Sequence, residues 1–199
     1  MALPRILEVG MQTPAPGAMS TPDPIARGDR QRGQWHPRII EPEKSMDAEQ
    51  RLQQLGIELP SPPPPAGNYV PGVLAGNLLF MSGVGPRRDD GSSITGKVGG
   101  GMTIEEGYAA ARVVGLNMLA NIRAVLGSLD RVERVVKVLG MVNSTPDFND
   151  MPKVVNGFSD LFVEVFGPER GRGARSAVGL VALPHQIAVE VEMVLQVSP

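Results

Sequence analysis

The chain has 199 residues, 42% of them hydrophobic, which is enough for one ordinary domain with a buried core. A formal net charge of −2 argues against the broad basic surface of a nucleic-acid-binding protein. The absence of Cys excludes disulfides, thiolate nucleophiles and cysteine zinc sites, and with only two His any metal site would have to rest on carboxylates.

Residues 1–45 mix Pro, Gly, Arg and Asp without a sustained period of two or of 3.6 residues, which predicts a disordered extension. We see no apolar run long enough for a membrane span and no apolar core of a signal peptide, so we expect a cytoplasmic protein. Met46 is a candidate native start, a hypothesis that the intact mass of the native protein would test.

Residues 46–67 combine a short helix with a linker. The segment "MDAEQRLQQLG" places Leu52 and Leu55 on one helical face, and Gly56 suits a left-handed C-terminal cap. The segment "LPSPPPPAG" that follows is a stiff extended linker, because consecutive prolines forbid a helix. The packed domain is therefore predicted to span residues 68–199.

Five strands are predicted in this domain. The segment "YVPGVLAGNLLFMSGVGP" reads as a hairpin that turns at residues 75–77, and the Val-rich "RVERVVKVLGMVN" reads as a strand half covered by a helix. The segment "GARSAVGLVALPHQIAVEVEMV" supplies two more strands with a turn at residues 183–187.

Two helices are predicted between these strands. Thr103 and Glu106 form a capping box for a helix over residues 104–126, which Gly127 ends. The segment "DMPKVVNGFSDLFVEVFG" is a second helix, with an apolar stripe of Phe158, Leu161, Phe162 and Val165. The order β-β-α-β-α-β-β predicts an α+β sandwich with both helices on one face of a sheet.

Charged residues interrupt the last two strands. Arg175 lies in an apolar strand, and alternation puts Glu190 and Glu192 on the face opposite Val189 and its neighbours. An unpaired buried charge is costly, so Arg175 either pairs with one of these glutamates at a subunit boundary or faces a ligand. For Glu192 we expect a solvated strand position.

The order of these elements, with "GNYVPGV", "AGNLLFMSGVGP" and "ARSAVGLVALPHQIAVEVE", resembles the RidA/YjgF family of reactive-intermediate deaminases from about Asn68 to Leu195. The resemblance implies a chorismate-mutase-like fold that assembles as a trimeric barrel, with small-carboxylate sites between subunits. It also implies a homotrimer with no metal, no cofactor and no membrane or nucleic-acid partner.

Site residues follow from the resemblance one by one. It assigns Arg175 to the substrate carboxylate and Glu190 to the attacking water, and it adds Tyr69, Gly83 and Asn156 as substrate-binding residues. The chain departs from the family pattern where Val84 replaces a glutamine and where Ala177, two residues after the arginine, replaces a frequent cysteine. Gly173 also replaces the usual proline, which indicates a divergent subgroup.

The chemistry is consistent with these residue types. A guanidinium grips a carboxylate through two hydrogen bonds, and a carboxylate with a suitable pKa can assist water attack on an imine carbon. The implied reaction is hydrolysis of 2-imino or enamine acids, such as 2-iminobutanoate and 2-iminopropanoate, to 2-keto acids and ammonia. Arg175 and Glu190 would then be the catalytic pair.

Two other functions stay open. The same cleft could serve a non-catalytic module that binds small carboxylates, and some relatives are described as endoribonucleases or translation inhibitors. The acidic balance and the 4% aromatic content disfavour RNA as substrate. The pattern leaves open whether Arg175 and Glu190 meet within one chain or across a boundary between chains.

Overall fold

The computed structural model describes residues 47–62 and 67–199, which lie within one compact unit, Glu41–Pro199. The expectations for residues 1–45, for a start at Met46 and for linker residues 63–66 fall outside the described residues. The described part is an α+β domain built from one five-stranded sheet, three α-helices and two short 3-10 helices.

The sheet has the order β1-β2-β5-β3-β4. Its strands are β1 (Gly72–Ala75), β2 (Leu78–Val84), β3 (Val132–Asn143), β4 (Ala174–Leu180) and β5 (Val189–Val197). β3 and β4 pair in parallel, and the other neighbours pair in antiparallel register. The predicted hairpin is confirmed, because β1 and β2 are joined by a tight turn in which Gly76 takes a φ of 63°.

The two long helices also match the sequence pattern. α2 (Ile104–Leu126) begins with the capping box of Thr103 and Glu106 and ends at Gly127. α3 (Met151–Gly171) extends past the predicted end at Gly167, where the backbone leaves helical geometry with a φ of 77° before one more helical segment that contains Pro168. The kink has a plain cause, since proline cannot continue the preceding hydrogen-bond ladder.

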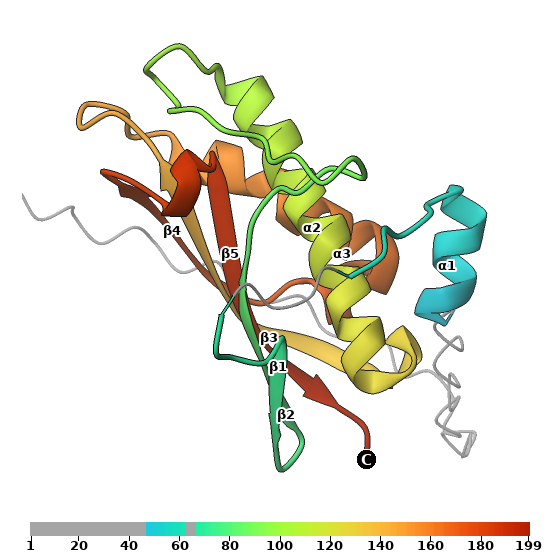
Figure 1. The fold of residues 1–199 in the computed structure, drawn as a ribbon. Helices are drawn as coiled ribbons and strands as arrows, with labels where there is room; N and C mark the ends of the chain where they lie inside the picture. Colours follow the sequence, from blue (N-terminus) through green and yellow to red (C-terminus); the bar gives the residue numbers. More distant parts are fainter. Residues whose placement is uncertain (1–46, 63–66) are drawn as a thin grey trace, which may run out of the picture. The chain divides into compact units, whose positions relative to one another are not determined.

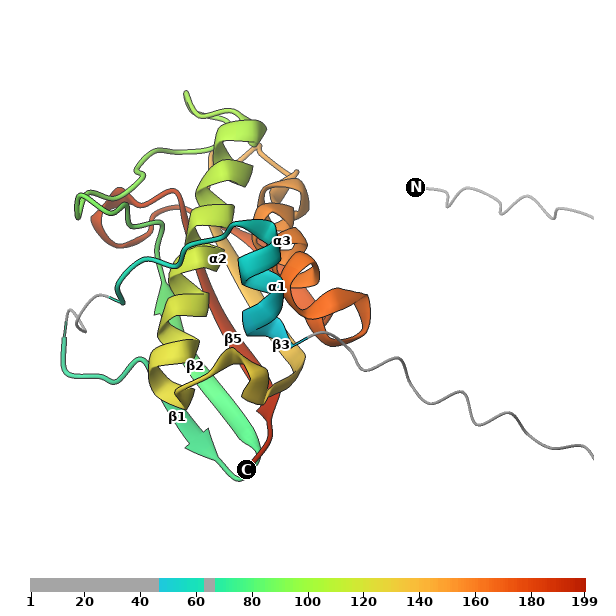
Figure 2. The ribbon, with the colours of Figure 1, turned by 90° about the vertical axis from the view of Figure 1, so that its right-hand side faces the viewer.

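α2 and α3 lie side by side over one face of the sheet, as predicted (Figures 1 and 2). The core between the two layers contains the predicted stripe of α3, all at 1% exposure or less, and the inward residues of the central strands. Gly157 lets the two helices approach closely, because a Cβ there would overlap with the backbone carbonyl of Tyr108.

The first helix, α1 (Ala48–Leu55), belongs to this packed unit, which extends the domain beyond the start expected near Asn68. The predicted helix and its left-handed cap at Gly56 are confirmed, and of the two leucines Leu52 is buried while Leu55 is 37% exposed. The Glu49 carboxylate accepts hydrogen bonds from Arg123 of α2 and from the backbone N–H of Leu129. These contacts fix a helix too short to be stable by itself.

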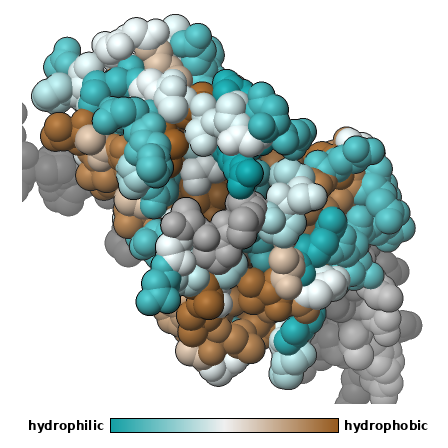
Figure 3. Space-filling model, in the orientation of Figure 1, coloured by the Kyte–Doolittle hydropathy of each residue, from teal (hydrophilic) through white to brown (hydrophobic). Residues whose placement is uncertain are grey.

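The face of the sheet away from the helices is only partly polar. Phe80 of β2 is 45% exposed, and Val178 and Leu180 of β4 are 37% and 36% exposed. Figure 3 shows hydrophobic residues gathered around the β1–β2 hairpin, where Val73 and Leu74 are also exposed. We call the sheet face away from α2 and α3 the open face.

Among the described residues, α2 is long and apolar enough by composition to cross a membrane, which the sequence pattern did not reveal. However, 61% of its apolar window is buried inside the domain. We therefore interpret α2 as the core helix of this fold.

Candidate functional site

Arg175 lies near the start of β4, on the side of the sheet that faces the helices. It pairs in register with Val138 of β3, which pairs in turn with Met193 of β5, and both neighbours are buried beneath the helices. Laterally paired residues share a face of a sheet, so the Arg175 side chain points toward α3.

Two neutral groups of α3 hold the guanidinium. Nη1 of Arg175 donates to Oδ1 of Asn156 at 2.8 Å and to Oγ of Ser159 at 3.0 Å. Arg175 forms no ion pair with a described residue of its own chain, and the alternative of a pairing with Glu190 or Glu192 across a subunit boundary stays open. The two hydrogen bonds therefore orient the guanidinium but do not neutralise it. An external anion or a carboxylate of another copy of the chain could balance its charge.

Glu190 lies on the opposite side of the sheet. It pairs in register with Met141 of β3, and the burial pattern of β5 alternates so that Glu190 and Glu192 face the open side. This confirms the predicted alternation of the strand. Burial raises the pKa of the Glu190 carboxyl above its ordinary value, and the nearby charge of Glu192 raises that pKa further.

Gly83 and Glu190 are brought together by an irregularity in β2. The register of β2 against β5 shifts between Met81 and Val84, and Gly83 lies in this shift. A Cβ at Gly83 would overlap with Oε1 of Glu190, so glycine is required for the carboxylate to lie in this position. The structure thus gives the predicted glycine a specific role in placing the glutamate.

The predicted pair is separated within one chain. Arg175 and Glu190 lie on opposite faces, and β3 lies between their strands. Neighbouring strands are about 4.8 Å apart, so the two strand axes are separated by roughly 10 Å before the difference in face is considered. A ligand bound inside a single chain cannot contact both side chains in this arrangement.

A pocket of about 230 Å³ lies at the part of β2 that has no partner in β1, next to the residues that precede β1. It brings together Tyr69 and Gly83 of the predicted set. Ser82 is fixed at its wall, since its hydroxyl donates to the backbone carbonyl of Val70 at 2.7 Å. This space is called the edge pocket below.

The edge pocket also contains residues that sequence reasoning missed. Asn117 and Asn121, one helical turn apart on α2, are 3% and 6% exposed, and Arg87 lies at the rim. Two asparagines four residues apart in an otherwise apolar stretch were a signal that could have found them. His185, which the sequence analysis assigned no role, also lines this pocket.

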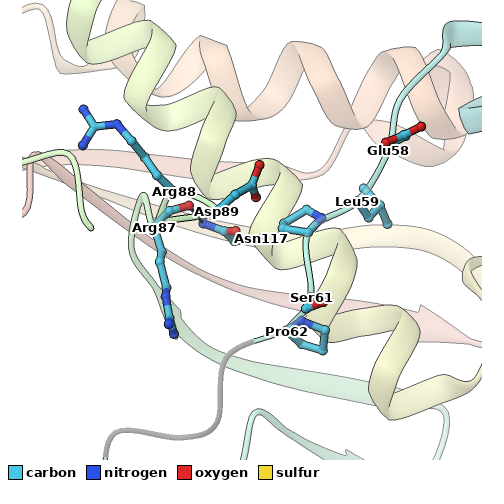
Figure 4. Close-up of a pocket in the computed structure, with 9 residues that line it drawn as sticks. Glu58, Leu59, Ser61, Pro62, Arg87, Arg88, Asp89 and Asn117 are labelled. Atoms are coloured by element: carbon cyan, nitrogen blue, oxygen red, sulfur yellow. Dashed lines mark hydrogen bonds between the residues drawn. The ribbon is translucent and has the colours of Figure 1, made fainter. Parts of the chain in front are cut away.

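A larger pocket of about 540 Å³ lies between residues 58–62 and residues 87–89 (Figure 4). Its charged residues, Glu58, Arg87, Arg88 and Asp89, are all exposed and balance in sign. Asn117 lines both pockets. The larger pocket contains none of the predicted site residues, so we place the candidate site at the edge pocket and at Arg175.

Among the described residues, no group of three or more His, Asp or Glu is placed to hold a metal ion.

Comparison with known proteins identifies relatives of the whole domain. Residues 49–193 match the family model described as "YjgF/chorismate mutase-like, putative endoribonuclease". The chain is 48% identical over 147 residues to protein TCP17 of Trypanosoma cruzi, covering 74% of this chain and 92% of that protein. It is 27% identical over 144 residues to a 2-iminobutanoate/2-iminopropanoate deaminase of Dermatophagoides farinae, covering 71% and 95%.

A solved structure agrees with this match. The protein from Shewanella oneidensis described as a "putative endoribonuclease" is 32% identical and superimposes with a TM-score of 0.72, covering 76% of this chain and 100% of that chain. The family match begins in α1 and ends within β5, so the resemblance seen in the sequence is confirmed. The chain belongs to the YjgF/chorismate-mutase-like family.

Proposed function

We propose that this protein hydrolyses 2-imino acids to 2-keto acids and ammonia, in clefts formed between copies of the chain. Two features of the chain carry the proposal, and each could supply half of a site. The Arg175 guanidinium is held by two neutral side chains, so no described carboxylate of its own chain balances its charge. The Glu190 carboxyl lies against Gly83 and has a raised pKa. The similarity to an imine deaminase supports the same reaction.

The carboxylate of the substrate would be bound by the guanidinium of Arg175. Asn156 and Ser159 hold Nη1, which fixes the orientation of the fork toward a planar anion. The main contribution of Arg175 is positioning, because its charge attracts the substrate carboxylate and not the cationic imine.

Glu190 would handle the water. Its carboxylate accepts a proton as water attacks the imine carbon, and it returns the proton to the nitrogen as the C–N bond breaks. The balance is R–C(=NH₂⁺)–COO⁻ + H₂O → R–CO–COO⁻ + NH₄⁺. A carboxyl whose pKa is raised by burial and by a like charge exchanges protons closer to neutral pH than an ordinary glutamate.

Assembly would complete the site. Because Arg175 and Glu190 face opposite sides of one sheet, a second copy must bring its Arg175 to the Glu190 side, or the reverse. The partly apolar open face, with Phe80, Val178 and Leu180, offers surface for such contacts. We propose the homotrimer that the family resemblance implies, and light scattering would test it.

The direct test measures ammonia and 2-keto acid release from 2-iminopropanoate and 2-iminobutanoate generated in situ. Wild type should accelerate hydrolysis, and Arg175→Ala should abolish the acceleration at unchanged assembly. Arg134→Ala is the matched control, because Arg134 is exposed on the adjacent strand β3. No acceleration by wild type would refute the deaminase and favour a non-catalytic carboxylate-binding module.

Endoribonuclease activity is the second candidate, favoured by the descriptions of the family and of the Shewanella relative. The net charge of −2 and the 4% aromatic content leave little surface for phosphates and stacked bases. Incubating labelled RNA with the same preparations would test it. Cleavage that survives Arg175→Ala and Glu190→Gln would point to a contaminant or to a different site.

A further inference from the structure

The inner end of the edge pocket holds a polar atom without a partner. Oδ1 of Asn121 is buried and receives no hydrogen bond from any described residue. Its neighbour on the same helix face differs, since Nδ2 of Asn117 donates to the carbonyls of Gly85 and Arg87 at 3.2 Å and 2.9 Å. A buried amide oxygen without a donor is disfavoured, so its retention calls for a partner outside the chain.

The pocket that reaches Asn121 has room for such a partner. Its volume of about 230 Å³ exceeds that of a single water, which takes about 30 Å³ in the liquid. Apolar Pro71, Val84 and Ile187 line it alongside the asparagine. Apolar walls interrupted by a few buried polar groups, here the amides of Asn117 and Asn121, are typical of a site that selects a small molecule by a few hydrogen bonds.

The wall formed by residues 184–187 carries backbone strain. His185 and Gln186 are consecutive non-glycine residues with φ values of 53° and 58°. The short helix η2 (Pro184–Gln186) holds them, with the N–H of Gln186 donating to Leu183 and that of Ile187 to Pro184. Left-handed backbone at two successive side chains is disfavoured and occurs preferentially at functional sites.

We propose that the edge pocket is the subsite for the substrate side chain, and that Asn121 selects side chains carrying a hydroxyl or a carboxamide. This inference rests on the proposed function, because Gly83 both lines the edge pocket and lies against the Glu190 carboxylate. A reacting carbon held beside Glu190 would lie next to Gly83, and its side chain would then occupy the edge pocket.

The chemistry of the amide sets the preference. An asparagine side chain offers a donor and an acceptor, and a half-turn of its amide presents either one to the pocket. A hydroxyl or a carboxamide can pair with both, whereas an aliphatic chain leaves the buried amide unpaired.

The test uses two 2-keto acids of the same heavy-atom shape, 2-oxosuccinamate with a carboxamide and 4-methyl-2-oxopentanoate with an isopropyl group. Titration calorimetry on the assembled wild-type protein should give a Kd for the carboxamide that is lower by about tenfold or more. In Asn121→Leu, the preference should disappear or reverse. Equal affinities in wild type, binding of neither compound, or a preference that survives in Asn121→Leu would overturn the proposal.

Asn149→Leu is the matched control, because it makes the same chemical change at an exposed residue outside the edge pocket. We expect this variant to keep the wild-type preference for the carboxamide. Should either variant fail to fold, the comparison of the two compounds on wild type still decides the inference.

Because the assay measures binding of products, its result does not depend on turnover. A carboxamide preference without imine hydrolysis would retain the subsite and reject the deaminase. Imine hydrolysis without the carboxamide preference would retain the deaminase and reject the subsite. The failure of one proposal can therefore be told from the failure of the other.

Discussion

Arg175 and Glu190 lie on opposite faces of one sheet, with β3 between their strands. Arg175 shares its cross-strand row with buried Val138 and Met193, and Glu190 shares its row with Met141. Two residues that a common substrate would have to contact are therefore separated within one chain. This arrangement makes the assembly, rather than the single chain, the unit in which the proposed chemistry would occur.

Subunit mixing should restore activity. Arg175→Ala and Glu190→Gln should each be inactive as pure proteins, but random reassembly of an equal mixture should give wild-type clefts at about a quarter of the positions, because each cleft takes one residue from each of two copies. The measurement is imine hydrolysis before and after dissociation and reassembly. A mixture no more active than its parents would place both residues in a cleft of one chain, or in none.

Gly83→Ala should disable the site with little effect on folding. The added Cβ would push the Glu190 carboxylate from its position, and a displacement of about 1 Å at a reacting group can lower kcat/KM by roughly 100-fold. Steady-state kinetics would measure the loss. In a Glu190→Ala background, Gly83→Ala should not lower kcat/KM any further. A further large decrease in kcat/KM there would show that Gly83 acts independently of Glu190.

Glu190→Gln should raise stability at neutral pH. Since burial raises the pKa of the folded carboxyl above 4.5, the unfolded chain ionises first, so Glu190 destabilises the fold increasingly as pH rises from 4.5 and fully once pH exceeds the raised pKa. The gain should shrink as pH falls and vanish below 4.5, where the carboxyl is protonated in both states. Thermal unfolding of the two proteins from pH 4 to pH 8 checks this, with the same substitution at the exposed Glu192 as the control.

Glu164→Gln should show the opposite pH dependence. Two hydrogen bonds from Arg112 lower the pKa of Glu164, so its contribution is present above 4.5 and is lost as pH falls through the lowered pKa. The side chains are 35% and 39% exposed, so screening limits the loss at pH 7 to about 0.5 kcal/mol. Urea denaturation at pH 7 and at pH 3 would measure it, and an equal loss at both values would contradict the assignment.

Leu52→Ala should destabilise the whole domain. Leu52 is 2% exposed, and truncating a buried leucine costs about 2–5 kcal/mol. The exposed Leu55 provides the control, since Leu55→Ala should cost much less. Chemical denaturation of both variants would show whether α1 unfolds with the sheet. Equal small effects would mean that α1 contributes little to the packed unit.

Local patterns were sufficient for the elements themselves. The capping box at Thr103, the turn at Gly76 and the alternation along β5 depend on residues close in sequence, and the structure confirms each. The family was also evident, because the order of short motifs persists along the chain. A short helix such as α1 was harder to place, since its packing depends on Glu49 meeting Arg123 and Leu129 far along the chain.

The sequence alone thus determined which residues form strands and helices, and which side of its own strand each charged residue occupies. It did not determine that Arg175 and Glu190 face opposite ways, because that relationship depends on the register and order of β4, β3 and β5. Nor did it determine the edge pocket, where α2, β2 and residues 184–187 bring Asn121 and His185 together. Such contacts arise from long-range packing, which local periodicity does not encode.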